Sequence, residues 1–218
     1  MDCLALYVTL KLAIITTVIL MALAAPVAYL LAHSDFRGKL FIEALIYLPT
    51  ALPPTVIGFY LLLVMGPRGF IGKTVESVTG GSFLFTFTGI AIASVVYSIP
   101  FAVQPMKAAF QKIDRRLIEN AYVLGLSKRS AFFRVALPNS KSGIAAAAVL
   151  VFLHTTGAFG VLIMVGGSIP GETKVASIAI YEAVEMMDYR GAGILSLCFI
   201  PVSYIFLIIV NKLNEDKK

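Results

Sequence analysis

Charged residues are scarce in this chain of 218 residues. They make up 14% of the sequence, whereas a soluble domain of this size carries about 25%. Hydrophobic residues make up 59%. This balance excludes an ordinary water-soluble domain and indicates a protein that sits in a lipid bilayer.

Cysteine and histidine are equally rare, with two of each in the whole chain. Cys3 and Cys198 lie in apolar surroundings, and neither has a cysteine or histidine neighbour at the spacing of metal ligands. We therefore expect neither a disulfide nor a metal site.

A complete phosphate-binding loop is also missing. The segment MGPRGFIGKT, residues 65–74, ends in the Gly-Lys-Thr of such a loop. The motif needs a glycine five positions before Gly72, where this chain has Pro67, which lacks the N–H that would help to surround a phosphate. We therefore expect that this segment binds no ATP; no catalysis and no cofactor are assigned to the chain.

Long apolar runs dominate what remains. A helix needs about 20 mainly apolar residues to cross a bilayer, and the period-2 alternation of barrel strands is missing. We predict an all-α polytopic membrane protein, with one domain over residues 1–218. Its five spans are expected near residues 4–31, 41–65, 83–106, 143–165 and 192–210. Residues 175–187 are too short to span and are expected to lie against the outer face or to dip partway in.

The distribution of lysine and arginine predicts the orientation of these spans. With the N-terminus outside, 13 of the 18 basic residues fall on the inside, eight of them in the loop 107–142, and the other five lie outside or near the outer face. Lys212, Lys217 and Lys218 then place the C-terminus inside.

Prolines interrupt several of the expected spans. The most concentrated group lies in LPTALPPTVIG, where Pro53 and Pro54 would free carbonyl groups that a neighbouring helix or a water-filled cavity must satisfy. Two interpretations stay open: simple kinked packing, or a bend at which a transport pathway opens.

The loop 107–142 predicts two short helices in DRRLIENAYVLGLSKRSAFFRVALPNS. Asp114 is expected to cap the first helix and Gly125 to end it in the left-handed conformation. Ser127 is expected to cap the second helix, and Pro138 to stop it.

The first of these helices has an apolar face of Leu117, Ala121 and Leu124. Together with Phe132 and Phe133, this surface is too large to leave in water, so the loop predicts a protein partner.

DNA is a second possible partner, because Ala121-x-x-x-Gly125-x-Ser127 has the spacing of a helix-turn-helix, followed by basic residues. The loop is tethered at both ends to membrane spans and has no third helix to complete a core. We therefore expect no nucleic-acid binding.

The segment ENAYVLGLSKRSAFFRVALPNSKSGI resembles the signature loop of the membrane subunits of ABC importers. The matches are Glu119, Ala121, Leu124, Gly125, Leu137, Pro138, Gly143 and Ile144, with Phe132 or Phe133 as the usual aromatic residue; Asn120 and Ser142 depart from the pattern.

This resemblance implies the fold of a type I importer permease whose loop docks in a cleft of a cytoplasmic ATPase dimer. ATP and Mg²⁺ would be bound by that ATPase, and a second copy of this chain would complete the pathway. The coupling residues so implied are Glu119, Ala121, Leu124, Gly125, Leu126, Phe132, Leu137, Pro138 and Gly143.

Within that family the chain is most similar to molybdate permeases, through LPTALPPTVIGFYLLLVMG, GPRGFIG and SIPGETK. The resemblance implies transport of molybdate, with tungstate inseparable from it, across the plasma membrane of a prokaryote, or the inner membrane of a Gram-negative one. Sulfate or another oxyanion is the alternative. A secondary carrier is more distant, because the five expected spans show no internal repeat.

An external oxyanion-binding protein would supply the substrate in such a system. Its expected contacts are in the two outer loops, at Arg68, Gly69, Gly171, Glu172, Thr173 and Lys174.

The fourth expected span departs from the subfamily, which has Gly-Glu-Phe-Gly after a basic residue. This chain reads FLHTTGAFGV, with Ala158 in the acidic position and His154 in the basic one. His154 is either a packed, hydrogen-bonded residue or, with Thr155, Thr156 and Gly157, a donor to a passing oxyanion.

Overall fold

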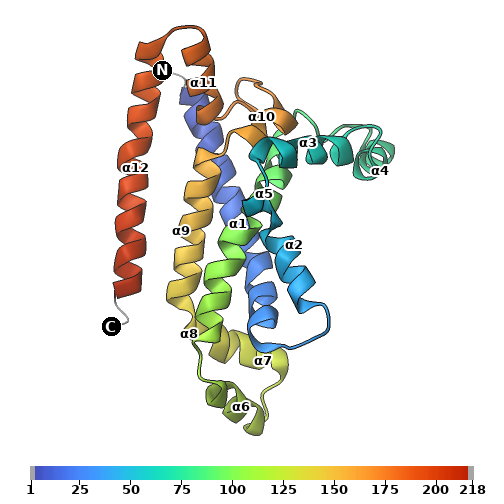
Figure 1. Cartoon of the computed structure of the whole chain (residues 1–218), viewed down its shortest axis with the longest axis vertical. Coiled ribbons are helices and arrows are strands. Elements are labelled where there is room, and N and C mark those ends of the chain that lie inside the picture. The colour runs from blue at the N-terminus through green and yellow to red at the C-terminus, as the bar shows by residue number, and fades with distance from the viewer. Residues whose placement is uncertain (1–2, 216–218) are drawn as a thin grey trace.

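The structure is a computed structural model that describes residues 3–215, and every regular element in this range is helical (Figure 1). The prediction of an all-α protein is confirmed. Lys217 and Lys218, two of the charges used to predict orientation, lie outside the described residues.

The elements are α1 (Cys3–His33), α2 (Lys39–Ala51), α3 (Pro54–Met65), α4 (Phe70–Thr79), α5 (Phe87–Gln111), α6 (Arg115–Val123), α7 (Lys128–Ala131), the π-helix η1 (Phe132–Ala136), α8 (Leu137–Asn139), α9 (Lys141–Gly157), α10 (Gly160–Gly166), α11 (Ala176–Glu185) and α12 (Tyr189–Glu215).

Three long helices, α1, α5 and α9, pack along one another and form the centre of the bundle. Small side chains line their contact, which lets the backbones approach closely, as is usual between membrane helices. Among them, Ala24 and Ala28 of α1, Ala102 of α5 and Ala147 of α9 are fully or nearly fully buried. Larger buried side chains, among them Leu31, Met106 and Phe110, fill the space at one end of the bundle.

Two of the expected spans are broken rather than continuous. Residues 41–65 form α2 and α3, and the chain bends by 113° between them, around Leu52 and Pro53. Pro54 lies in the first turn of α3, where a missing N–H is harmless. Residues 143–165 fall in α9 and α10, with a break at Ala158 and Phe159. The prolines of the second expected span therefore do not simply kink one helix. They divide the span into two helices that point in different directions.

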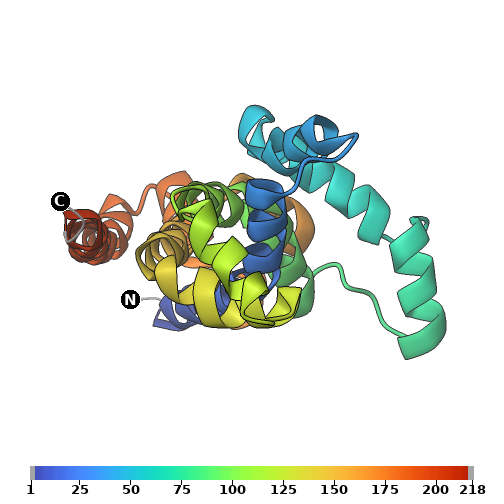
Figure 2. The same ribbon diagram turned by 90° about the horizontal axis from the view of Figure 1, so that it is seen from below.

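By length and composition, α1 and α5 can each cross a membrane alone. Within residues 3–215, which the structure describes, the number rises to as many as four if each of two bent pairs is one span: α2 with α3, and the segment Lys128–Asn139 with α9, which is bent by 77°. The last helix, α12, is 27 residues long, begins three residues before the expected span, and stands at the edge of the bundle (Figures 1 and 2).

Two short helices lie at the end of the bundle opposite α6. The helix α11 occupies most of the segment 175–187 and packs against α1, where Ala176 N donates a hydrogen bond to Thr9 Oγ1 at 2.8 Å. The helix α4 projects away from the bundle on the far side of α3 (Figure 2).

The second helix of the loop 107–142 does not stop at Pro138, so this prediction was wrong. Pro138 lies inside α8, which follows α7 and η1 without a break, and the chain turns only at Ser140. The wide turn of η1 gives the physical reason. There Leu137 N donates a hydrogen bond to Phe132 O, five residues back. This turn therefore lacks the hydrogen bonds to the fourth residue back that form an α-helix and that a following proline would disrupt.

Gly143 lies where α9 comes close to α5, so a side chain there should be poorly tolerated. A Cβ at this position would collide with the Cβ of Ala109 on α5 and crowd Pro105 O. We predict that Gly143→Ala lowers the free energy of unfolding by about 1–3 kcal/mol through overpacking. Gly193→Ala is the matched control, because a Cβ there meets nothing within 4 Å. Thermal unfolding of both variants in one detergent checks this, and equal midpoints would contradict it.

Candidate functional site

A cavity of about 470 Å³ lies where the broken helices meet. The start of α3 forms one side through Pro54 and Thr55, and the end of α9 forms another through His154 and Gly157. Of the residues that the sequence indicated for a pathway, the structure brings Pro54, His154 and Gly157 together here. Pro53 is exposed and immediately precedes α3. Because irregular backbone at membrane depth needs protein or a water-filled space beside it, the two breaks suit a cavity at this place.

His154 is both packed and exposed to this cavity. Its Nδ1 lies 3.0 Å from Ser98 Oγ on α5. Its ring stacks on Phe101, with ring centroids 3.9 Å apart, and lies 4.4 Å from the ring of Tyr97. The two interpretations of this histidine are therefore compatible, since one edge is held while the residue still lines the cavity.

The two threonines beside His154 serve the backbone and the helix contact. Thr155 is buried, and its Oγ1 lies 3.4 Å from Ser98 Oγ. Thr156 Oγ1 donates to Leu153 O at 2.8 Å, which satisfies a carbonyl in the last turn of α9. Ser98 was missed by the sequence analysis, and its one signal was a hydroxyl within an apolar span.

Ala158, in the position of the subfamily's acid, is buried. Its carbonyl accepts a hydrogen bond of 2.6 Å from Ser177 Oγ. Among the described residues that line the cavity there is no Asp, Glu, Lys or Arg. The cavity therefore presents an imidazole, a hydroxyl and backbone groups, with no fixed charge to hold an anion tightly.

A second site is the helix α6 at one end of the bundle. Asp114 Oδ1 accepts a hydrogen bond of 2.9 Å from Arg116 N, as the capping prediction required. Gly125 adopts φ +83°. Gly125 N then bonds to Tyr122 O, and Leu126 N bonds to Ala121 O, each at 3.0 Å. This pair of bonds is a Schellman motif, which explains why a glycine follows Ala121 at this spacing.

The apolar face of α6 is only partly covered by the chain itself. Ile118 and Ala121 are buried, whereas Leu117 is 49% exposed, Leu124 79% and Val123 86%. The bundle covers Ile118 and Ala121, so Leu117 and Leu124 are left for the expected protein partner, which stays a prediction. We call the exposed apolar surface of Leu117, Val123 and Leu124 the α6 face.

An aromatic cluster joins α6 and η1 to the bundle. The ring centroid of Tyr29 on α1 lies 5.5 Å from that of Phe110 on α5 and 5.1 Å from that of Phe132 on η1. The helix α6 contacts α7 and η1, which places it beside the same cluster. Phe132 is thus a link between helices, and the sequence analysis missed its partners Tyr29 and Phe110.

The remaining residues implied as coupling positions divide by exposure. Glu119 and Pro138 are exposed, Leu126 and Leu137 are half-buried, and Gly143 lies inside the contact of α9 with α5.

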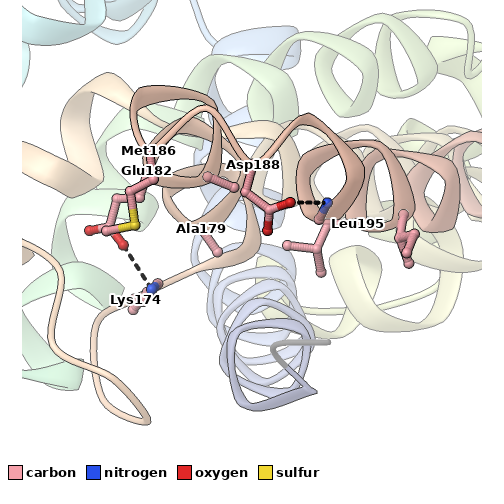
Figure 3. A pocket seen from close by; sticks show the side chains of 9 residues that line it. Lys174, Ala179, Glu182, Met186, Asp188 and Leu195 are labelled. Atoms are coloured by element: carbon pink, nitrogen blue, oxygen red, sulfur yellow. Dashed lines mark hydrogen bonds and ion pairs between the residues drawn. The ribbon is translucent and has the colours of Figure 1, made fainter.

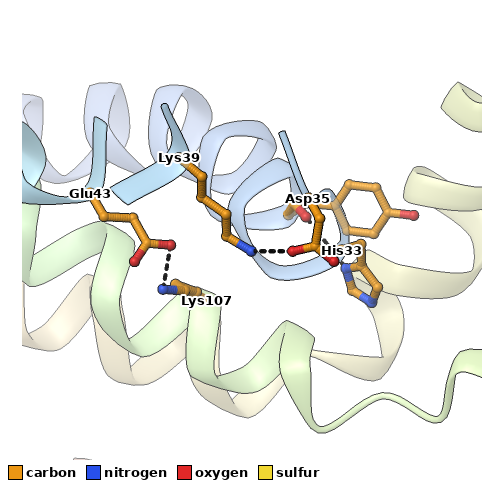
Figure 4. A network of polar contacts seen from close by, with 6 residues as sticks. His33, Asp35, Lys39, Glu43 and Lys107 are labelled. Atoms are coloured by element: carbon orange, nitrogen blue, oxygen red, sulfur yellow. Dashed lines mark hydrogen bonds and ion pairs between the residues drawn. The ribbon is translucent and has the colours of Figure 1, made fainter. Parts of the chain in front are cut away.

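Two ion pairs lie at the same end of the bundle (Figure 4). Lys107 on α5 pairs with Glu43 on α2 at 2.7 Å, and both side chains are largely buried. Lys39 pairs with Asp35 at 3.2 Å in a more exposed position. The pair between Lys107 and Glu43 fixes the start of the broken span α2–α3 against the central bundle.

The expected contacts of the binding protein lie at the opposite end. Arg68, Gly171 and Glu172 are exposed, and Gly69 is half-buried. Thr173 is fully buried, where its Oγ1 donates to Gly166 O at 2.7 Å and accepts from Ile169 N at 3.0 Å.

Lys174 pairs with Glu182 of α11 at 2.7 Å, beside a cavity of about 230 Å³ that Asp188 also lines (Figure 3). Thr173 and Lys174 therefore hold the outer loop in place, and Arg68, Gly171 and Glu172 remain as surface.

Known proteins show clear similarity to this chain. A family model described as binding-protein-dependent transport system inner membrane component matches residues 24–217. The molybdenum transport system permease protein of Azotobacter vinelandii is 43% identical over 94% of this chain and 91% of its own length. A probable sulfate transport system permease protein of Chlorokybus atmophyticus is 34% identical over 94% of this chain and 71% of its own length.

A solved structure shares the fold. A bacterial ABC transporter involved in the import of the acidic polysaccharide alginate has a chain that matches with a TM-score of 0.73 at 19% identity, covering 98% of this chain and 77% of that one. At this identity the match supports the architecture of the helices and nothing about the substrate.

Ser98 should stabilise the contact between α5 and α9. Ser98→Ala leaves the imidazole of His154 without its hydroxyl partner, so we predict a loss of about 1–3 kcal/mol in the free energy of unfolding. Ser196→Ala is the matched control, because that hydroxyl bonds only to Ala192 O in its own helix. Thermal unfolding of the purified variants is the measurement, and a Ser98 variant as stable as the control would refute the role of this contact.

Proposed function

The chain belongs to the family of binding-protein-dependent transport system inner membrane components, and from this premise we propose that it carries molybdate or tungstate inward as one of two identical subunits. It is the permease subunit of an ABC importer, and ATP hydrolysis takes place on separate ATPase subunits. The substrate proposal is supported by the 43% identity to a molybdenum transport permease over most of both chains. Sulfate is the second candidate, because a sulfate permease relative is 34% identical.

We place the chain in the plasma membrane of a prokaryote with five crossings: α1, α2 with α3, α5, α9 with α10, and α12. The N-terminus is outside, and α6 faces the cytoplasm. The excess of lysine and arginine in the loop 107–142 supports this orientation. The whole chain then forms one transmembrane domain.

The α6 face is proposed as the surface that docks in the ATPase dimer, and it is the observation that carries this function. Leu124 and Val123 remain exposed, whereas Ile118 and Ala121 of the same helix are buried. A partner would cover this apolar surface, while Glu119 and the basic residues around it set the orientation. ATP and Mg²⁺ would lie in the ATPase, so this chain needs no cofactor.

The proposed movement follows from the aromatic cluster. When ATP closes the ATPase dimer, the two α6 helices move with it, and Tyr29 and Phe132 transmit the displacement to α1 and α5. Rigid-body movement of this kind is a common way in which a small local change alters a distant site.

The cavity at His154 is proposed as part of the pathway. One chain supplies only one wall, so a second copy would face Pro53, Pro54 and Gly157 from the other side. Thr155 and Thr156 support the end of α9 behind this wall. The absence of fixed charge among the described lining residues suits passage, because an anion held too tightly halfway would not leave.

The external binding protein is proposed to contact Arg68, Gly69, Gly171 and Glu172. Thr173 and Lys174 would shape this surface from below through their buried bonds. The dependence of this family on a binding protein supports the assignment.

Leu124→Asp tests the docking surface. Because Leu124 is exposed in this chain, the variant should fold normally, but docking would bury an unpaired carboxylate. We expect ATP-driven molybdate uptake into proteoliposomes to fall by at least about tenfold, since such burial costs several kcal/mol. Gln111→Glu, an exposed position at the end of α5, is the control with the same change in charge. Normal assembly and uptake by the Leu124 variant would rule out the α6 face as the coupling surface.

Competition between oxyanions tests the substrate. With the complete transporter and its binding protein, we expect tungstate to compete with molybdate at equal concentration. Sulfate should fail at a roughly hundredfold excess, a difference of about 2.7 kcal/mol in affinity. Effective competition by sulfate would favour the second candidate and leave the permease assignment intact.

A further inference from the structure

A groove of about 450 Å³ lies between α1 and the segment formed by α7 and η1. It is separate from the cavity at His154 and from the α6 face. Ala22, Pro26 and Leu30 of α1 line one side, and Phe133 of η1 lines the other. Lys128 and Arg129 of α7 line the same groove. We call it the basic-rimmed groove.

The apolar side of this groove continues a stripe along α1. Ile14 and Val18 are exposed and continue the ridge of Ala22, Pro26 and Leu30 at intervals of four, a ridge that winds around the helix by about 40° per step. An exposed apolar stripe on a helix that crosses the bilayer is a surface for lipid chains. The stripe therefore leads from the middle of the membrane into the groove.

The length of the groove matches one leaflet. From Met21 to Leu30 the helix rises by about 14 Å, at about 1.5 Å per residue. Half of the hydrocarbon thickness of a bilayer is about 15 Å. A lipid chain that lies along α1 in this stretch would place its headgroup at the end of the helix, beside α7.

Two cationic side chains of α7 lie where the headgroup of such a lipid would sit. Lys128 and Arg129 are exposed, and neither forms an ion pair with an acid within the part of the chain that the structure describes. Basic pockets beside membrane helices bind anionic headgroups, and each lysine or arginine near the surface strengthens that binding. A neutral zwitterionic lipid would fill the apolar side equally well but would gain less from this pair of charges.

We propose that the basic-rimmed groove binds an anionic phospholipid, with its phosphate at Lys128 and Arg129 and an acyl chain against Pro26 and Phe133. The groove is lined by α1, α7 and η1. The helix α6 lies farther out at the end of the bundle (Figure 1). A lipid and the ATPase would therefore use different surfaces. The site needs only that α7 lies at one membrane face, so it does not rest on the proposed orientation or substrate.

The π-helix connects this lipid to the coupling loop. Phe132 and Phe133 are consecutive, with ring centroids 4.9 Å apart. Phe132 packs on Tyr29 in the aromatic cluster, while Phe133 is 63% exposed and lines the groove. The bound lipid would thus press on the outer side of the same turn whose inner side holds the loop to the bundle.

The chain contains no tryptophan, so Phe133→Trp introduces a single fluorescent reporter in the groove. We would reconstitute the full chain in nanodiscs of phosphatidylcholine and add phosphatidylglycerol or phosphatidylcholine with brominated acyl chains, which quench tryptophan on contact. At the same low mole fraction, we expect the relative affinity for brominated phosphatidylglycerol to be roughly tenfold higher, from the combined pull of two cations. Val18→Trp, on the exposed stripe away from the basic residues, should be quenched equally by both lipids.

Charge substitutions complete the test. In the Phe133→Trp background, Lys128→Gln with Arg129→Gln should abolish the preference for phosphatidylglycerol. Arg115→Gln with Arg116→Gln removes the same charge from α6, outside the groove, and should preserve it. Equal quenching by both lipids at Phe133→Trp would overturn the proposal, as would a preference that survives the first pair or disappears with the second. Absence of quenching by either lipid would show that a second copy of the chain covers the groove, which also overturns it.

Discussion

The aromatic cluster around Tyr29 is the contact on which the rest of this structure depends. It brings the end of α1, the end of α5 and the π-helix η1 together, with Phe110 and Phe132 against the same ring. Without it the loop 107–142 would be a flexible connection, and a movement of α6 would not be transmitted to the membrane-spanning helices. With it, a push on the α6 face has a packed path to two membrane-spanning helices, since closely packed interiors transmit displacement instead of absorbing it.

A second constraint shapes the other half of the molecule. Hydrocarbon offers no partners to free backbone groups, so a membrane chain can depart from helix only where protein or a polar space receives them. Both breaks, at Pro53 and at Ala158, fall around one cavity. Two tasks would then be divided: the continuous helices α1 and α5 carry force from the loop, and the interrupted segments α2–α3 and α9–α10 surround a space without fixed charge among its described lining.

The sequence predicted those features that depend on neighbours along the chain. Asp114 caps α6 and Gly125 ends it, because a cap and a left-handed turn are decided within a few residues. It failed where distant segments decide. The rotation of α6 that turns Ile118 inward depends on the bundle beneath it, and the contact of Ser98 with His154 joins residues 56 positions apart. Pro138 was misread because a π-turn upstream of it has no sequence signature as clear as that of a cap.

The central claim is that α6 moves as one body with the ends of α1 and α5. The most direct measurement is electron paramagnetic resonance of spin-label distances in the assembled transporter, with Cys3 and Cys198 replaced by serine. Labels at Arg116 on α6 and Gln104 on α5 report the distance within one chain, and a single label at Arg116 reports the distance between the two copies that we propose. The account predicts that ATP changes the distance between copies and leaves the distance within each chain unchanged. A change within the chain while the bundle stays in place would contradict it.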